Sequence, residues 1–178
     1  DLHVGIVSSS LGDSGADVAC PAQRNHPKYK PDQVDMAHLV GSLERSSTRG
    51  NAQGFLEWRA GVTDTATFNA ELADMVSDVG EDGCGWEGSL ESWYRFLVDP
   101  VPYQELTRVP CANSSSLALN CVQPATDGND RILLDDVLLA QRAAFVREDS
   151  LLAIVMLTDE NDCSMQVGNQ SWVVLNIE

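Results

Sequence analysis

The sequence has few basic residues. It contains 11 Lys and Arg residues against 27 Asp and Glu residues, so its formal net charge at pH 7 is −16. A phosphate backbone or an anionic lipid surface would be repelled by such a chain. We therefore expect no nucleic acid among its partners. An acidic surface instead suits solubility, cation binding or contact with basic proteins.

Long hydrophobic runs are also missing. The longest apolar stretch is Leu151–Leu157, which is far shorter than the roughly 20 residues of a membrane-spanning helix. We therefore predict no transmembrane segment. The chain opens with DLHVGIV, without an initiating Met and without the charged and apolar regions of a signal peptide. We expect any signal peptide or lipid anchor to lie upstream of Asp1.

Zinc-binding patterns are absent, although the chain has five cysteines. No C-x-x-C pair occurs, and none of the three histidines lies near a pair of cysteines. Cysteines in an acidic, Lys-poor chain indicate disulfides formed in an oxidising compartment. We therefore expect an extracytoplasmic protein, whether secreted, periplasmic or anchored at the cell surface. Cys111 and Cys121 are predicted to pair and close the loop CANSSSLALNC.

The hydrophobic pattern predicts alternating strands and helices. Apolar residues at spacings of three and four predict three helices, over Thr65–Val79, Trp86–Leu97 and Asp135–Arg147. Apolar or alternating runs predict four strands, at Asp1–Ser10, Gly54–Arg59, Leu151–Leu157 and Ser171–Asn176. Uninterrupted apolar strands between amphipathic helices are typical of a parallel sheet with helices on both faces.

These elements predict one α/β domain over residues 1–178, with a doubly wound, mostly parallel sheet. A Pro-rich segment, residues 98–131, is predicted to be a loop insertion. Leu151–Leu157 would be a central buried strand, and its carboxyl end would lie at the edge where such folds bind ligands. Thr158, Asp159 and Glu160 would then form part of that ligand edge.

Three segments together resemble von Willebrand factor A (vWA) domains, in particular the exported or lipid-anchored vWA-like proteins of myxobacteria and related bacteria. They are DLHVGIVSSSLG, GCGWEGSLESWYRFL and FVREDSLLAIVMLTDENDCS. The resemblance covers nearly the whole chain, from the second strand of the family fold onward. It implies a doubly wound α/β sandwich with a metal-ion-dependent adhesion site at the carboxyl edge of the sheet.

That family site combines a D-x-S-x-S motif, a Thr and an Asp. By resemblance Asp159 matches the Asp, and Glu87 in GCGWE stands where the family has its Thr. No D-x-S-x-S motif occurs in these residues, so the first strand of the family fold would precede Asp1. A divalent ion needs several oxygen ligands. The resemblance thus implies Mg²⁺ or Ca²⁺ as a cofactor, with only part of its ligand set in this chain.

The resemblance also implies a disulfide between Cys84 and Cys163, because it places the loops that carry them at the same edge of the sheet. With Cys111 paired to Cys121, Cys20 is left without a partner in this sequence. The hypothesis is a pair of disulfides and one odd cysteine.

Two short motifs favour other chemistry. Gly12–Gly15 spells GDSG, which surrounds the nucleophile of chymotrypsin-like proteases, but no His stands in the context of a catalytic base for Ser14. Asp127–Asp130, DGND, is rich in oxygen ligands but lacks the spacing of a calcium loop. A turn followed by an acidic helix start explains it more simply.

The sequence therefore predicts a non-catalytic extracytoplasmic binding or adhesion module whose partner is a protein or a surface ligand. One alternative is a structural component of a surface or extracellular assembly that binds no metal. A remote alternative is a hydrolase that uses Ser14 or the acids that follow Thr158. For Asp159, Glu160 and Asp162, a polar loop that caps the strand Leu151–Leu157 and the next helix is as good an explanation as a ligand site.

Overall fold

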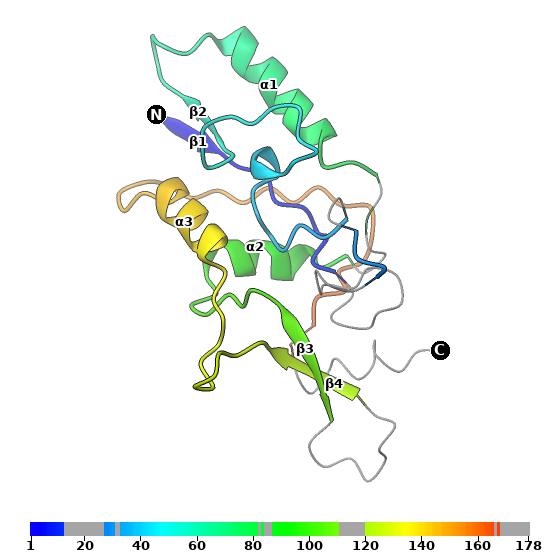
Figure 1. Ribbon diagram of the computed structural model, residues 1–178. Helices are drawn as coiled ribbons and strands as arrows, with labels where there is room; N and C mark the ends of the chain where they lie inside the picture. The colour runs from blue at the N-terminus through cyan, green and yellow to red at the C-terminus, as the bar shows by residue number, and fades with distance from the viewer. Residues whose placement is uncertain are drawn as a thin grey trace.

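The computed structural model describes residues 1–12, 27–30, 33–81, 83, 87–110, 120–165 and 167. Figure 1 shows the elements in chain order. They are β1 (Leu2–Val4), the 3-10 helix η1 (Val40–Ser42), β2 (Leu56–Trp58), α1 (Thr65–Ser77), α2 (Ser89–Leu97), β3 (Leu106–Pro110), β4 (Asn120–Pro124) and α3 (Asp136–Phe145).

The strands form two small antiparallel sheets. β1 pairs with β2, with Leu2 opposite Trp58, and β3 pairs with β4, with Leu106 opposite Pro124. No parallel pair of strands occurs in the described part of the chain. The prediction of a doubly wound, mostly parallel α/β sheet is therefore wrong.

The main reason is the apolar run Leu151–Leu157, which forms neither strand nor helix. The prediction that it is a buried central strand is wrong, because Leu151 is 95% exposed and Leu157 is 83% exposed. A strand becomes buried only when neighbouring strands accept its backbone hydrogen bonds and helices cover its faces. The hydrophobic pattern records the apolar side chains but not whether such a neighbour exists.

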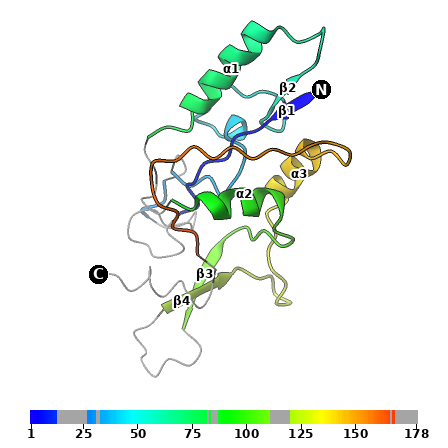
Figure 2. The ribbon, with the colours of Figure 1, turned by 180° about the vertical axis from the view of Figure 1, so that it is seen from behind.

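The β1–β2 ribbon lies between α1 on one side and α2 and α3 on the other, as both views show (Figure 1 and Figure 2). Neighbouring residues of an extended chain point to opposite faces. Phe55 accordingly packs with Leu39, Phe96 and Leu138, toward α2 and α3. Leu56 packs on the other face, in the core cluster that also contains Val40, Phe68 and Met75. Each face of the ribbon thus has its own apolar core.

The three predicted helices are confirmed, and α2 lies inside its predicted range Trp86–Leu97. α1 covers most of the predicted range Thr65–Val79, and α3 lies inside the predicted range Asp135–Arg147. Asp64 caps α1, because its carboxylate accepts the N–H of Thr67 at 2.8 Å. A carboxylate at a helix start also interacts favourably with the helix dipole.

The third helix, α2, turns a different face to the core than its apolar pattern predicts. The apolar side chains of Leu90 and Tyr94 are 46% and 40% exposed. The buried residues of α2 are Ser92, Arg95 and Phe96. Charged side chains usually face solvent. Because Arg95 is buried instead, α2 packs in an orientation that its apolar pattern does not predict.

Arg95 is fully buried because its guanidinium has partners on several segments. Its Nε donates to the carbonyl of Met36 at 3.0 Å and its Nη2 to the carbonyl of Tyr103 at 2.5 Å. Nη2 also lies 3.4 Å from the carboxylate of Asp135. The guanidinium stacks 4.3 Å from the centre of the Tyr103 ring. These contacts hold α2 against both the segment before η1 and the segment before α3.

Asp135 completes this network from the start of α3. Its carboxylate accepts from Nε2 of His38 at 2.8 Å and from the backbone N–H of Leu138 at 3.1 Å, so that it caps α3. Burial raises the pKa of Asp135, but the bonds from His38 and Leu138 and the charge of Arg95 outweigh it, and the pKa is lowered. The ionised form is therefore the one that the fold stabilises.

The predicted insertion, residues 98–131, contains β3 and β4, which form a hairpin on the far side of α2 and α3 from the ribbon (Figure 1). Asp127 forms a turn here, since its carboxylate accepts the backbone N–H groups of Asn129 and Arg131. The expectation of a turn at DGND is confirmed. No helix in the described part of the chain is long and apolar enough to cross a membrane.

We predict that Asp135→Asn lowers the free energy of unfolding at pH 7 by about 3–5 kcal/mol, because it leaves the buried Arg95 without its counter-charge. The loss should shrink as the pH falls from 3.8, the ordinary pKa of Asp, through the lowered pKa of the native carboxylate, below which the wild-type side chain is protonated as well. Urea unfolding measures both effects. Asp136→Asn, at the exposed neighbouring position, is the matched control and should cost less than about 1 kcal/mol. Equal losses in the two variants would contradict the role of Asp135.

Candidate functional site

In the segment that follows β1, Ser9 and Ser10 lie beside the residues that lead into α2. Ser10 and Glu87 form an antiparallel bridge. The backbone N–H of Gly88 donates to the carbonyl of Ser9 at 3.0 Å. The hydroxyl of Ser9 donates to the carboxylate of Glu87. These contacts hold Glu87 against Ser9 and Ser10.

The loop that follows the apolar run reaches the same place. The backbone N–H of Cys163 donates to the carbonyl of Glu87 at 2.7 Å. Two acids of this loop, Asp159 and Glu160, lie close enough to Glu87 for their charges to act on it. We call Glu87, Asp159 and Glu160 the acidic cluster. Residues that are more than 70 positions apart in the sequence thus meet at one end of the ribbon.

The electrostatics of the acidic cluster are unfavourable. Burial raises the pKa of Glu87, because it disfavours the charged form, and the negative charges of Glu160 and Asp159 raise it further. A positive charge at this place would interact favourably with all three carboxylates. The cluster is therefore chemically suited to a cation or to a basic group of a ligand.

A buried ion pair between Asp35 and Arg45 lies beside Ser8 and Ser10, the neighbours of Ser9. Asp35 is almost completely buried and accepts two hydrogen bonds from the guanidinium of Arg45, at 2.5 and 2.6 Å. It also accepts a bond from the hydroxyl of Ser8, and its backbone N–H donates to Ser10. Because such paired, doubly bonded charges are geometrically demanding, they fix the serines on either side of Ser9.

Asp162 and Ser164 cap α2 from a distant part of the chain. The first residues of a helix have unpaired N–H groups, and Gly88 at the N-cap has no side chain to satisfy them. The N–H of Leu90 donates to Asp162 at 2.9 Å and that of Glu91 to the hydroxyl of Ser164 at 2.8 Å. A loop that caps a strand and the helix after it was one expectation from the sequence, whereas Asp162 instead caps α2, a helix that precedes the loop in the chain.

The structure places the other predicted residues of the ligand edge as follows. Asp159 and Glu160 are exposed beside Glu87, as the acidic cluster requires. Thr158 makes a local turn, since its hydroxyl accepts the N–H of Glu160 and donates to its carbonyl, both at 3.2 Å. Its hydroxyl is thus used within the loop. Ser14 of the GDSG motif lies outside the described residues.

A metal ion was expected here from the vWA resemblance. Within the described residues, no group of three or more His, Cys, Asp or Glu side chains is arranged to hold one. Glu87 and Asp159 supply oxygen donors of the kind that Mg²⁺ and Ca²⁺ bind, but fewer than such ions need. The cofactor therefore stays a prediction.

The cysteine pairs are placed only in part. Cys121 takes part in a disulfide, but Cys111, its predicted partner, lies outside the described residues. Cys163 has a free thiol, and Cys84 also lies outside the described residues. The bond from Cys163 to Glu87 brings Cys163 to the segment that carries Cys84, three positions earlier. The Cys84–Cys163 disulfide is not formed in the structure and stays a prediction.

Sequence reasoning missed a second acidic feature next to α2. A hollow of about 470 Å³ is lined by Glu91, Tyr94, Asp99, Tyr103, Ser164, Met165 and Val167. Burial raises the pKa of Glu91, the charges of Asp99 and Asp162 add to this, and that of Arg95 opposes it. Two tyrosine rings beside carboxylates suit a basic side chain. Only Glu91 in α2 and Asp99 just after it are close enough in the sequence to give a signal, because Ser164, Met165 and Val167 come from a distant segment.

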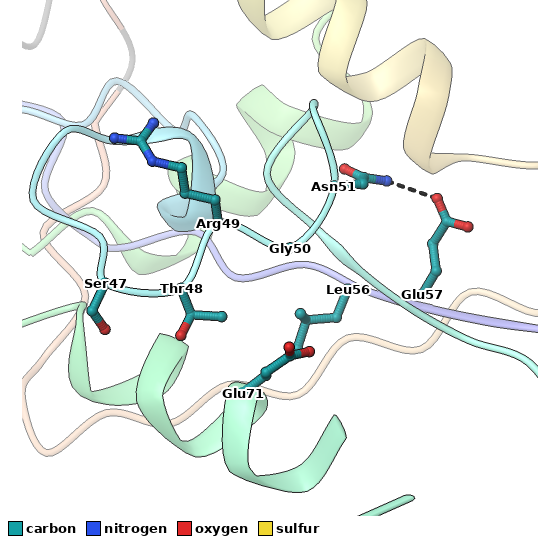
Figure 3. A pocket seen from close by; sticks show the side chains of 8 residues that line it. All are labelled: Ser47, Thr48, Arg49, Gly50, Asn51, Leu56, Glu57 and Glu71. Carbon is teal, nitrogen blue, oxygen red and sulfur yellow. Dashed lines mark hydrogen bonds between the residues drawn. The ribbon is translucent and has the colours of Figure 1, made fainter. Parts of the chain in front are cut away.

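A larger hollow of about 540 Å³ lies between the loop before β2 and α1 (Figure 3). Its lining includes none of the predicted site residues. Asn51 donates to Glu57 at 2.8 Å there, and this bond, with Arg59 nearby, lowers the pKa of Glu57 against a smaller effect of burial. The carboxylate of Glu57 is thus already paired, unlike those of the acidic cluster.

We predict that Glu87→Gln raises the melting temperature at neutral pH. The pKa of Glu87 is raised above its ordinary 4.5, so the native state binds the proton more tightly than the unfolded chain. The contribution of Glu87 to stability is fully present below pH 4.5 and is lost as the pH rises through the raised pKa. The variant should therefore exceed the wild type at pH 7 and match it at pH 4 in calorimetry.

The matched control is Asp74→Asn, which removes an exposed acid from α1. It removes one negative charge, as Glu87→Gln does, but leaves the acidic cluster intact. The account is contradicted if both variants raise the melting temperature equally, or if Glu87→Gln lowers it at pH 7.

Comparison of the chain with protein-family models, with curated proteins and with solved structures found no match.

Proposed function

We propose that the protein is a non-catalytic, extracytoplasmic binding module. Its partner is a protein or a surface ligand that approaches the acidic cluster. The observation that carries the proposal is that the loop with Asp159 and Glu160 is held against Glu87 by the bond from Cys163, so that burial and the charges of these acids raise the pKa of Glu87. Three carboxylates held together without a compensating charge are costly unless a positive group joins them.

The surrounding framework supports a binding role. The acidic cluster is positioned by backbone bonds from Gly88 and Cys163 and by the hydroxyl of Ser9. A site positioned by a hydrogen-bonded framework binds with less loss of conformational freedom. The hollow that Glu91 and Asp99 line adds further negative charge next to it.

The location is proposed from the cysteines and the charge. Cys121 takes part in a disulfide, and disulfides persist in oxidising compartments. The excess of acids over Lys and Arg favours basic groups on the partner. Both features fit a protein that acts outside the cytoplasm.

A structural component of an extracellular assembly, without metal, is the second candidate. The observation that favours it is the exposed apolar run Leu151–Leu157, which is the kind of surface that subunits of an assembly cover. The two candidates differ in what they require of the acidic cluster, since only the first gives it a ligand.

The test is calorimetric titration of the protein with Mg²⁺, Ca²⁺ and Mn²⁺ at constant ionic strength. We expect saturable binding of at least one ion, with a higher melting temperature when that ion is present. Asp159→Ala should weaken the binding by about tenfold or more, because it removes one of the three carboxylates of the acidic cluster. Asp74→Asn is the control for net charge and should leave the affinity unchanged.

Two outcomes would contradict the cation-dependent form of the proposal. One is the absence of both heat and thermal stabilisation with all three ions, which would favour the structural component. The other is an affinity that Asp159→Ala and Asp74→Asn lower equally, because binding would then reflect the overall charge of the protein.

A further inference from the structure

The apolar run Leu151–Leu157 has the geometry of a β-strand without a neighbour. Its side chains alternate in exposure: Leu151, Val155 and Leu157 are 95%, 81% and 83% exposed, whereas Leu152 and Met156 are 48% and 45% exposed. Period-two alternation is the signature of an extended strand with one face toward the protein. Within the described residues, no hydrogen bond is made by the backbone of this run.

Both ends of the run are held by the rest of the fold. Before it, Arg147 donates to the carbonyl of Asp1 at 3.0 Å. After it, the N–H of Cys163 donates to Glu87 at 2.7 Å. Figure 2 shows the segment in orange across the face turned to the viewer, at the level of β1 between α1 and α2. The run is thus fixed at both ends, while its exposed backbone is open to pairing.

An open strand of this kind pairs with another extended chain. Apolar side chains on the run favour a partner strand that is apolar as well, since cross-strand neighbours pack against each other. Exposed acids flank the run on both sides: Glu148 and Asp149 precede it, and Asp159, Glu160 and Asp162 follow it. A partner strand with Lys or Arg next to each end would therefore be complementary in charge.

A second copy of the chain fits this surface poorly. In a parallel pair each acidic flank would lie beside the same flank of the other copy, and in an antiparallel pair beside the opposite flank, which is also acidic. Each copy also carries a net charge of −16. Like charges directly opposite each other destabilise a pair of strands.

We propose that Leu151–Leu157 is a strand-addition site for an extended, apolar segment of another polypeptide whose ends carry Lys or Arg. The segment pairs with the backbone of the run and covers its exposed apolar side chains, and its basic ends lie next to the acidic flanks. This site goes beyond the proposed function, because it does not depend on cation binding by the acidic cluster.

The test uses a short fluorescent peptide that alternates Val and Thr and has Lys at both ends. Fluorescence anisotropy should show binding to the wild type, and hydrogen exchange should show that residues 151–157 exchange rapidly alone and become protected with the peptide. Val155→Lys should weaken binding by about tenfold or more. Val62→Lys, at a position that is 79% exposed away from the run, is the matched control and should bind as the wild type does.

A second peptide with Glu at both ends tests the charge complementarity and should bind at least about tenfold more weakly. Three results would overturn the proposal. They are equal binding of the two peptides, protection of residues 151–157 in the free protein, and a concentration-dependent dimer that Val155→Lys dissociates. The last would identify a second copy as the occupant.

Discussion

The burial of Arg95 against Asp135 is the interaction on which the arrangement of the helices depends. Removing a guanidinium from water costs several kcal/mol, and the cost is offset only if its partners are in place. Those partners belong to the segment before η1, the loop after α2 and the start of α3. Arg142 of α3 adds to this by donating to three carbonyls at the end of α2. α2 can therefore pack in only one orientation.

That orientation positions the candidate site. α2 is fixed at its carboxyl end, and the residues before its amino end, Glu87 and Gly88, contact Ser9. The loop after the apolar run contacts Glu87 through Cys163. The same loop has two tasks, because Asp162 caps α2 while Asp159 and Glu160 face Glu87. One loop therefore caps α2 and also carries acids whose negative charges repel that of Glu87. A positively charged ligand would offset the repulsion among the carboxylates of the acidic cluster.

Local features of the fold were predictable from the sequence, and long-range ones were not. The helices α1 and α3 follow from apolar spacing, and the turn at Asp127 follows from its residue types. The orientation of α2 was missed because Arg95 was expected at the surface. The sheet was predicted wrongly because an apolar run such as Leu151–Leu157 is buried only if a neighbouring strand pairs with it. The vWA resemblance picked out Glu87 and Asp159, while the hollow lined by Glu91 depends on distant segments.

The most direct test of the account is an NMR titration of the side-chain carboxyl carbon of Glu87 in the wild type and in Glu160→Gln. The central claim is that the acids of the cluster act on one another. We expect the wild-type midpoint to lie above 4.5 and to move toward 4.5 in the variant, because burial and the charge of Glu160 both raise the pKa of Glu87. A wild-type midpoint at or below 4.5, or one that Glu160→Gln leaves unchanged, would contradict the acidic cluster and the function proposed from it.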